Sequence, residues 1–126
     1  MVRKSYILIA DSDPSDLTSL GRELSSAGYT IYTARNGMEV MNICRMFKVD
    51  LAIIDITMPD LSGIEFAKYV QYGFGVPIIV LSAEDDPKSV TQYMNIGVYA
   101  YTAKPIDTRT MLPMIATALG DDSSGS

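Results

Sequence analysis

The chain has 126 residues, a formal net charge of −5 and 48% hydrophobic residues, which fits one globular domain with a modest core. Because acidic residues exceed basic ones and no Lys/Arg cluster occurs, we expect no nucleic-acid or membrane binding by this chain. The sequence holds no histidine, which excludes histidine metal sites and Ser-His-Asp triads. A single cysteine, Cys44, expected to be buried and inert, and no recognisable signal peptide predict a cytoplasmic setting.

Short apolar runs rich in β-branched and aromatic residues predict strands, and stretches with helical spacing separate them. Several of these runs are almost wholly apolar, which is typical of parallel strands covered on both faces. Strands that alternate with helices predict an α/β fold, a single doubly wound (βα)5 domain with a five-stranded parallel sheet of the flavodoxin-like kind. The predicted strands are Tyr6–Ala10, Thr30–Ala34, Leu51–Ile54, Ile78–Leu81 and Tyr99–Ala103.

Capping residues mark the ends of the predicted helices. Asp13-Pro14 and Asp86-Pro87 each indicate an N-cap followed by proline in the first turn. Gly28 and Gly97 are placed to end these two helices. Residues 62–65, Ser-Gly-Ile-Glu, fit a capping box for a further helix.

The first and last helices carry further predictions. The first repeats apolar residues with helical spacing up to Ala27, which predicts one buried face. The last is expected from about Asp107 to Leu119, and Pro113 inside it predicts a late start or a bend. Residues 1–119 would then form the domain, and residues 120–126, rich in Ser and Gly, a flexible tail or linker.

Polar residues follow the predicted strands at the edge where parallel carboxyl ends meet and ligands usually bind. Asp55 is the most informative of them, because it closes an apolar strand where a carboxylate has no packing role. Burial would disfavour its charge unless a cation or donor held it, so Asp55 is a candidate nucleophile. The side chains expected at this edge are Asp11, Ser12, Asp13, Asp55, Thr57, Ser82, Glu84 and Lys104.

The residue types at this edge indicate metal and phosphoryl chemistry. Carboxylates at Asp11, Asp13 and Asp55, without histidine, favour a hard divalent cation, most plainly Mg²⁺. Lys104 and Ser82 on the opposite side suit a phosphoryl group, whose transfer depends on positioning and charge neutralisation. For Asp13 the competing interpretation is a helix N-cap, which the following proline favours.

On these residues the chain resembles the receiver domain of two-component response regulators over nearly its whole length. The resemblance implies a signalling domain rather than an enzyme. Asp55 would accept a phosphoryl group from the phosphohistidine of a histidine kinase or histidine phosphotransfer protein, with self-phosphorylation and slow self-dephosphorylation. The matching segments are Tyr-Ile-Leu-Ile-Ala-Asp11, Asp55-Ile-Thr-Met-Pro-Asp-Leu-Ser-Gly63, Ile-Ile-Val-Leu-Ser82-Ala and Tyr101-Thr-Ala-Lys104-Pro105.

The resemblance also implies roles around the phosphoacceptor. Asp11, Asp55 and the backbone carbonyl of Thr57 would bind Mg²⁺. Ser82 would hydrogen-bond a phosphoryl oxygen, and Lys104 would pair with the phosphoryl oxygens, placed by a cis peptide bond to the following proline.

A conformational switch is implied as well. Ser82 would move toward the phosphoryl group and Tyr101 would turn inward, which would alter the surface formed by the fourth helix, fifth strand and fifth helix. That surface would address an unknown output domain or effector protein, and a homodimer through it is a further expectation. The alternative for Tyr101 is simple packing with neighbouring tyrosines. Thr57 and Glu84 occupy the variable positions that would set the lifetime of the phosphorylated state.

One position departs from the family pattern. Ser12 stands where the family usually has a second consecutive acidic residue that binds the metal directly. One anionic ligand fewer should weaken Mg²⁺ binding, since affinity for divalent cations follows ligand charge and number. This departure supports an alternative function, a pseudo-receiver that acts as a protein-interaction module without being phosphorylated.

An enzyme is the remaining alternative. Residues 11–15, Asp-Ser-Asp-Pro-Ser, also resemble the opening motif of haloacid-dehalogenase-like phosphatases, with Asp11 as nucleophile and Asp13 as acid–base group. That family needs a downstream lysine followed by an acidic pair at a strand end. Here the pair Asp85-Asp86 precedes Lys104, so the order does not match.

Overall fold

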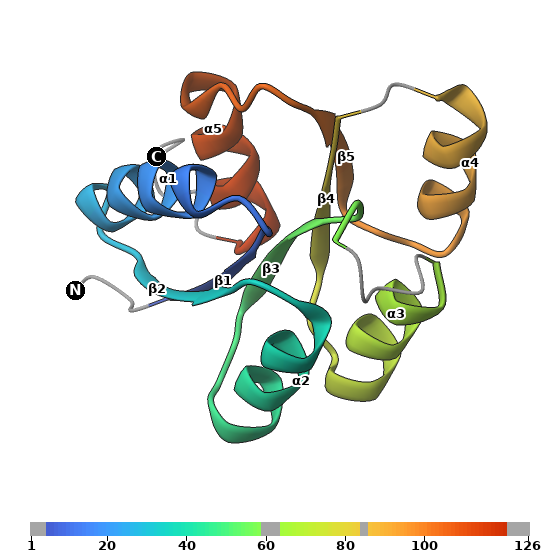
Figure 1. Ribbon diagram of the computed structural model, residues 1–126, viewed down its shortest axis with the longest axis horizontal. Coiled ribbons are helices and arrows are strands. Elements are labelled where there is room, and N and C mark those ends of the chain that lie inside the picture. The colour runs from blue at the N-terminus through green and yellow to red at the C-terminus, as the bar shows by residue number, and fades with distance from the viewer. Residues whose placement is uncertain (1–4, 59–63, 84–85, 121–126) are drawn as a thin grey trace.

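The structure is a computed structural model and describes residues 5–58, 64–83 and 86–120. Within these ranges the strands form one five-stranded parallel sheet in the order β2-β1-β3-β4-β5 (Figure 1). This order is that of flavodoxin-like doubly wound sheets, so the predicted fold class is confirmed. The strands are β1 (Tyr6–Ala10), β2 (Thr30–Ala34), β3 (Leu51–Asp55), β4 (Ile78–Ser82) and β5 (Ala100–Ala103).

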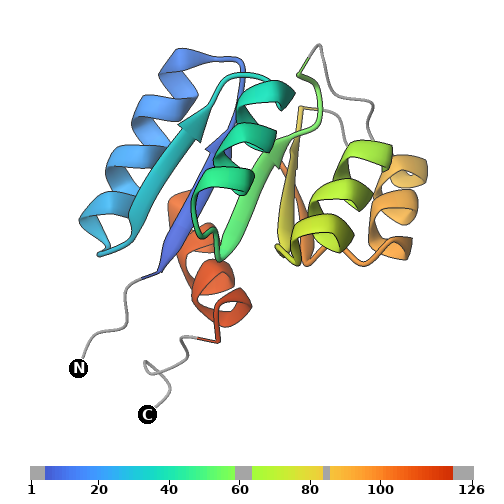
Figure 2. The ribbon, with the colours of Figure 1, turned by 90° about the horizontal axis from the view of Figure 1, so that it is seen from below.

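Helices cover both faces of the sheet. The first and fifth lie on one face, and the second, third and fourth lie on the other (Figures 1 and 2). The third helix continues directly into a π-helical turn, η1 (Tyr69–Gly73). The α-helices are α1 (Pro14–Ser26), α2 (Gly37–Met46), α3 (Ile64–Lys68), α4 (Pro87–Asn95) and α5 (Thr108–Ala118).

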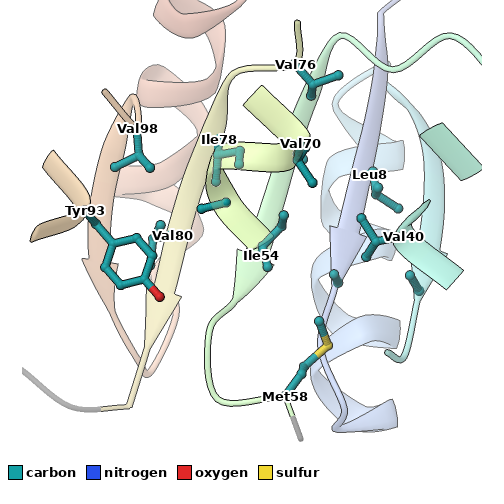
Figure 3. Close-up of a cluster of buried hydrophobic side chains, with 14 residues drawn as sticks. Leu8, Val40, Ile54, Met58, Val70, Val76, Ile78, Val80, Tyr93 and Val98 are labelled. Carbon is teal, nitrogen blue, oxygen red and sulfur yellow. The ribbon is translucent and has the colours of Figure 1, made fainter. Parts of the chain in front are cut away.

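Two apolar clusters hold these layers together, one on each face of the sheet. Successive side chains of a strand point to opposite faces, so Leu8 joins the cluster beneath α2, α3 and α4, while Ile7 joins the one beneath α1 and α5. Figure 3 shows the first cluster, in which Leu8 lies beside Val40 of α2, and Ile54 lies beside Val70 of η1. Packing on both faces fixes the central strands and therefore the residues at their ends.

The predicted caps are confirmed where the structure describes them. Asp13 is the N-cap of α1 and accepts a hydrogen bond from the Ser15 backbone N–H, and Asp86 caps α4 in the same way. The turns after these helices place Gly28 and Gly97 at φ +103° and +91°, a left-handed conformation that glycine adopts without strain. The predicted capping box at 62–65 begins outside the described residues.

Strands β3 and β4 each run one residue further than predicted. The Ile56 backbone N–H donates to the Leu81 carbonyl at 3.1 Å, which keeps Asp55 inside the ladder. The backbone N–H of Lys104 donates to the Ser82 carbonyl at 2.9 Å, which keeps Ser82 inside the ladder as well. Two predicted functional residues are thus strand residues, held by backbone hydrogen bonds rather than by a loop.

Strand β5 and helix α1 are instead shorter than predicted. β5 begins at Ala100, one residue later than predicted, because Tyr99 still belongs to the turn after α4 and is 40% exposed. Ala27 was predicted on the buried face of α1, but α1 ends at Ser26 and Ala27 is its exposed C-cap.

Of the two alternatives predicted for α5, the late start is wrong, because this helix begins at Thr108, directly after its N-cap Asp107, and contains Pro113. The bend at Pro113 stays a prediction. Proline removes the backbone hydrogen bond to the carbonyl four residues earlier, that of Arg109. Pro113 and Arg109 both lie on the exposed side of α5, where the Arg109 carbonyl is open to hydrogen bonding by solvent.

The remaining expectations on organisation are tested only in part. Cys44 is half-buried, and burial raises the pKa of its thiol, which disfavours the reactive thiolate. None of the helices in the described ranges has the length and apolar character that crossing a membrane requires. The predicted tail lies outside the described residues except for Gly120, so the division into residues 1–119 and 120–126 stays a prediction.

Candidate functional site

The carboxyl ends of the central strands meet at one edge of the sheet, as Figure 2 shows for the strand arrows. Asp11 follows β1, Asp55 ends β3, Ser82 ends β4 and Lys104 follows β5. The strand register aligns these positions, since Asp55 pairs with Leu81, the residue before Ser82, and Ser82 pairs with Ala103, the residue before Lys104.

Lys104 occupies the centre of the site. Its Nζ donates to Oδ2 of Asp11 at 2.7 Å and to Oδ2 of Asp55 at 2.8 Å. It also donates to Oδ2 of Asp16 at 3.0 Å. The side chains of Asp11 and Asp55 are 1% and 2% exposed and that of Lys104 is 18% exposed, so both inner pairs are shielded from water.

The other oxygens of the two buried carboxylates also have donors. Oδ1 of Asp11 accepts from the Asp13 backbone N–H at 3.0 Å. Oδ1 of Asp55 accepts from the Thr57 N–H at 2.8 Å and from its hydroxyl at 2.6 Å. In the described part of the chain, every buried side-chain nitrogen and oxygen has a hydrogen-bond partner. The site is therefore satisfied as it stands, with both carboxylates held in place.

These contacts shift the two carboxyl groups in opposite directions. Burial acts to raise the pKa of Asp55, but hydrogen bonds from Lys104 and Thr57 outweigh it and hold that pKa below its ordinary value. Burial dominates at Asp11 and raises its pKa, although Lys104 and the Asp13 N–H oppose the change. Burial acts to lower the pKa of Lys104, but its three carboxylate partners raise it. Asp55 is therefore the more firmly ionised carboxylate of the pair.

The third carboxylate of the cluster is not the predicted one. Asp13 was expected to converge with Asp11 and Asp55, but its Oδ1 caps α1 at 2.9 Å from the Ser15 nitrogen, as the competing interpretation held. Asp16, which sequence reasoning missed, contacts Lys104 instead. A signal for it was present, since Asp16 precedes buried Leu20 by four residues and so lies on the same helix face.

The remaining predicted residues lie around this cluster, but their roles stay predictions. Ser82 is 2% exposed beside the strand that carries Asp55, and Ser12 is exposed at the end of β1. Glu84 lies outside the described residues. The Lys104–Pro105 peptide bond is cis, as the resemblance implied.

Tyr101 of β5 is half-buried and packs against Tyr93 of α4, with ring centroids 5.9 Å apart. This contact supports the packing alternative for the conformation described here. It also places Tyr101 between β5 and α4, where a turn of its ring would change the outer surface. The switch role of Tyr101 therefore stays a prediction.

The residues present fit a Mg²⁺ ion that takes some of its ligands from the protein and the others from water and a phosphoryl group. Asp11 and Asp55 are buried oxygen donors, and Mg²⁺ is usually held by one or two carboxylates together with waters and phosphate oxygens. Within the described residues, no three acidic or other metal-binding side chains form a cation site by themselves. Mg²⁺ would thus depend on the Thr57 carbonyl, on water and on a phosphoryl oxygen, and would share two carboxylates with Lys104.

The Thr57 hydroxyl should stabilise the ionised form of Asp55. Thr57→Val removes this donor and keeps the backbone one, so we expect a loss of about 1–2 kcal/mol in the free energy of unfolding at neutral pH. Because the pKa of Asp55 is lowered in the fold, this stability exists above the ordinary aspartate pKa and disappears as pH falls through the folded value. Urea unfolding at neutral and acidic pH measures it. Thr33→Val, at an exposed position of β2, is the matched control, and equal losses in both variants would contradict the role of Thr57.

A doubly wound sheet with a buried aspartate–lysine cluster at its carboxyl edge defines the class of protein, and comparisons agree with it. The family model of the response regulator receiver domain matches residues 7–116. The transcriptional regulatory protein GlrR of Escherichia coli (strain K12) is 32% identical over 118 residues, which are 93% of this chain and 27% of that protein. The response regulator GtcR of Aneurinibacillus migulanus is 35% identical over 101 residues, 80% of this chain and 42% of GtcR.

Solved structures show the same architecture. A CheY-like response regulator receiver domain protein from Methanospirillum hungatei JF-1 superposes with a TM-score of 0.88 at 26% identity, covering 98% of this chain and 100% of that one. The chemotaxis response regulator CheY4 of Vibrio cholerae gives a TM-score of 0.82 at 28% identity, covering 93% and 100%. The chain belongs to the response regulator receiver domain family, a family of signalling domains. It spans less than half the length of GlrR and of GtcR.

Proposed function

We propose that this chain is a phosphoacceptor receiver domain and that Asp55 accepts the phosphoryl group. The observation that carries the proposal is the state of Asp55, a carboxylate 2% exposed yet held ionised, 2.8 Å from the Lys104 ammonium. The donor would be a phosphohistidine of a histidine kinase or histidine phosphotransfer protein. An Asp55 oxygen attacks phosphorus, the bond from phosphorus to the imidazole nitrogen breaks, and that nitrogen keeps the electron pair.

The surrounding residues support this transfer by neutralising charge. Lys104 already lies against the accepting carboxylate, so its ammonium offsets negative charge on the incoming phosphoryl oxygens without a large rearrangement. Ser82, buried at the end of the neighbouring strand, would donate to a phosphoryl oxygen. Mg²⁺, held by Asp11, Asp55 and the Thr57 carbonyl, would add further charge neutralisation when bound.

Phosphorylation would bias a two-state equilibrium of the domain. It would replace the single negative charge of the Asp55 carboxylate with about −1.5 to −2 on the phosphoryl group, at a site that also holds Asp11, Asp16 and Lys104. Ser82 would move toward the new group, and Tyr101 would lose or change its packing on Tyr93, which alters the α4–β5–α5 surface. A homodimer through this surface, slow self-dephosphorylation and lifetime control by Thr57 and Glu84 belong to the same proposal.

The readout would lie in another domain or protein. The chain spans 27% of GlrR, whose name describes a transcriptional regulatory protein, so relatives of this kind contain much sequence beyond the receiver. We propose that this receiver likewise addresses an output domain or a separate effector in the cytoplasm. With a net charge of −5, it would not itself contact nucleic acid.

The pseudo-receiver is the second candidate, favoured by Ser12 at the position of a family metal ligand. A Mg²⁺ titration with and without beryllofluoride, a phosphoryl mimic, separates the two functions. The phosphoacceptor predicts amide NMR shifts around Asp55, Ser82 and Tyr101 that require both Mg²⁺ and the mimic. An unchanged spectrum at millimolar Mg²⁺ would favour the interaction module. The phosphatase alternative loses its acid–base group, because Asp13 is engaged as a helix cap.

Restoring the missing acidic residue should strengthen metal binding. Ser12→Asp places an additional carboxylate next to Asp11, and we expect it to tighten Mg²⁺ binding on the order of tenfold. Isothermal titration with Mg²⁺ measures the change. Ser15→Asp adds the same charge at an exposed position in the first turn of α1 and serves as the control. No tightening in Ser12→Asp, or equal tightening in both variants, would refute a ligand role for position 12.

A further inference from the structure

The pair between Lys104 and Asp16 lies outside the residues that the resemblance assigns to the site. Asp16 belongs to the first turn of α1, whereas Asp11 and Asp55 lie at strand ends. Its Oδ2 is 3.0 Å from Nζ of Lys104, within hydrogen-bond range. A residue of α1 thus accepts a hydrogen bond from the Lys104 ammonium, which is expected to pair with the phosphoryl oxygens.

The three contacts account for every donor of the lysine. An ammonium group has three N–H donors and no acceptor. Asp11, Asp55 and Asp16 each accept one bond from Nζ, at 2.7, 2.8 and 3.0 Å. A phosphoryl oxygen on Asp55 could therefore bond to Lys104 only if one of these contacts is given up.

Asp16 is the contact that is easiest to exchange. Its side chain is 38% exposed, against 1% and 2% for Asp11 and Asp55, so water can replace Lys104 as its partner. Asp16 also lines a cavity of about 400 Å³ between α1 and the segment that follows β5, together with Glu23, Lys104 and Pro105. Releasing Asp16 leaves a carboxylate at the rim of this open cavity, whereas releasing Asp11 would leave a buried charge unpaired.

We propose that Asp16 is a positioning residue that holds Lys104 through its third donor and competes with the phosphoryl group for that ammonium. This inference rests on the proposed function. Arrival of a phosphoryl oxygen releases Asp16 from Lys104. The Asp16–Lys104 pair therefore weakens binding of a phosphoryl group at Asp55. Release also removes the ion pair between α1 and Lys104, two of whose residues line the cavity between α1 and the segment after β5.

Binding of beryllofluoride at saturating Mg²⁺ tests the competition. Asp16→Asn removes the anionic competitor, and we expect the dissociation constant of the mimic to fall about fivefold. Glu23→Gln removes the same charge from the same cavity but not from Lys104, so its dissociation constant should stay within about twofold of the native value. Asp16→Glu, which keeps the carboxylate, should also stay near native. Equal tightening in the Asn and Gln variants would reduce the effect to general electrostatics and overturn the proposal.

A second readout needs neither Mg²⁺ nor the mimic. In protein labelled with ¹⁵N-lysine, an ammonium with three carboxylate partners should exchange its hydrogens slowly and give an observable Lys104 signal. Asp16→Asn should accelerate that exchange, and Glu23→Gln should not. An unchanged Lys104 signal in Asp16→Asn would overturn the positioning role. A native protein that fails to bind the mimic would instead overturn the proposed function, so the two failures are distinguishable.

Discussion

Replacing Lys104 with methionine is expected to lower the free energy of unfolding by about 3–5 kcal/mol at neutral pH. Methionine fills much of the same space but leaves the carboxylates of Asp11 and Asp55 facing each other, 1% and 2% exposed, without their shared cation. Removing one partner of a buried ion pair lowers the free energy of unfolding by more than the intact pair contributes to it, because the remaining charge is buried away from water. Urea unfolding of the native and variant proteins measures the loss.

The loss should depend on pH and on Mg²⁺. The lowered pKa of Asp55 contributes stability above the ordinary aspartate pKa of about 4, and this contribution vanishes as pH falls through the folded value. The difference between the native protein and Lys104→Met should therefore shrink in acid. Mg²⁺ should restore more stability to the variant than to the native protein, since it replaces the missing cation between the same two carboxylates.

Lys48→Met is the matched control for this substitution. Lys48 is 73% exposed and its Nζ lies 3.8 Å from Asp50, whose other oxygen accepts from the Tyr6 N–H, so removal of this solvated ammonium should cost less than about 1 kcal/mol. Similar losses in both variants, or no additional Mg²⁺ stabilisation of Lys104→Met, would contradict the view that Lys104 neutralises a buried acidic site.

Asp55→Asn is expected to reduce phosphoryl acceptance from a small phosphodonor by more than about a thousandfold. The amide has no anionic oxygen to attack phosphorus, and it offers Mg²⁺ a weaker ligand. The variant should stay folded, because Lys104 keeps Asp11 and Asp16 as partners and one of two adjacent buried carboxylates is neutralised.

The label is measured as the fraction of protein that gains the mass of one phosphoryl group. Asp86→Asn is the control, since asparagine caps α4 as well as aspartate does and the site is untouched. Full labelling of Asp55→Asn would place the acceptor elsewhere.

Much of the fold was predictable because its signals are local. The central strands are runs of apolar residues because both of their faces are covered. Asp13 and Asp86 each precede a proline, which indicates the start of a helix. Once the strands are placed, parallel topology brings Asp11, Asp55 and Lys104 to one edge without further information. The Lys104 contacts at 2.7 and 2.8 Å confirm that convergence.

The rest depends on three-dimensional detail that the pattern does not encode. Pro14 already indicates Asp13 as the cap of α1, but the contact of Asp16 with Lys104 depends on where the chain after β5 places the lysine. The Thr57 hydroxyl bond to Asp55 depends on a rotamer, and the π-helical turn at Tyr69–Gly73 depends on how α3 packs. Such choices are made by tertiary contacts.

The position of the phosphoryl group on the native protein decides whether Asp55 is the acceptor. The protein would be treated with a small phosphodonor and Mg²⁺, digested, and its phosphorylated residue identified by fragmentation mass spectrometry. We expect a single labelled residue, Asp55, and no label when Mg²⁺ is removed by a chelator. Labelling of Asp11 or Asp16, or no labelling of a protein that binds Mg²⁺ normally, would contradict this expectation.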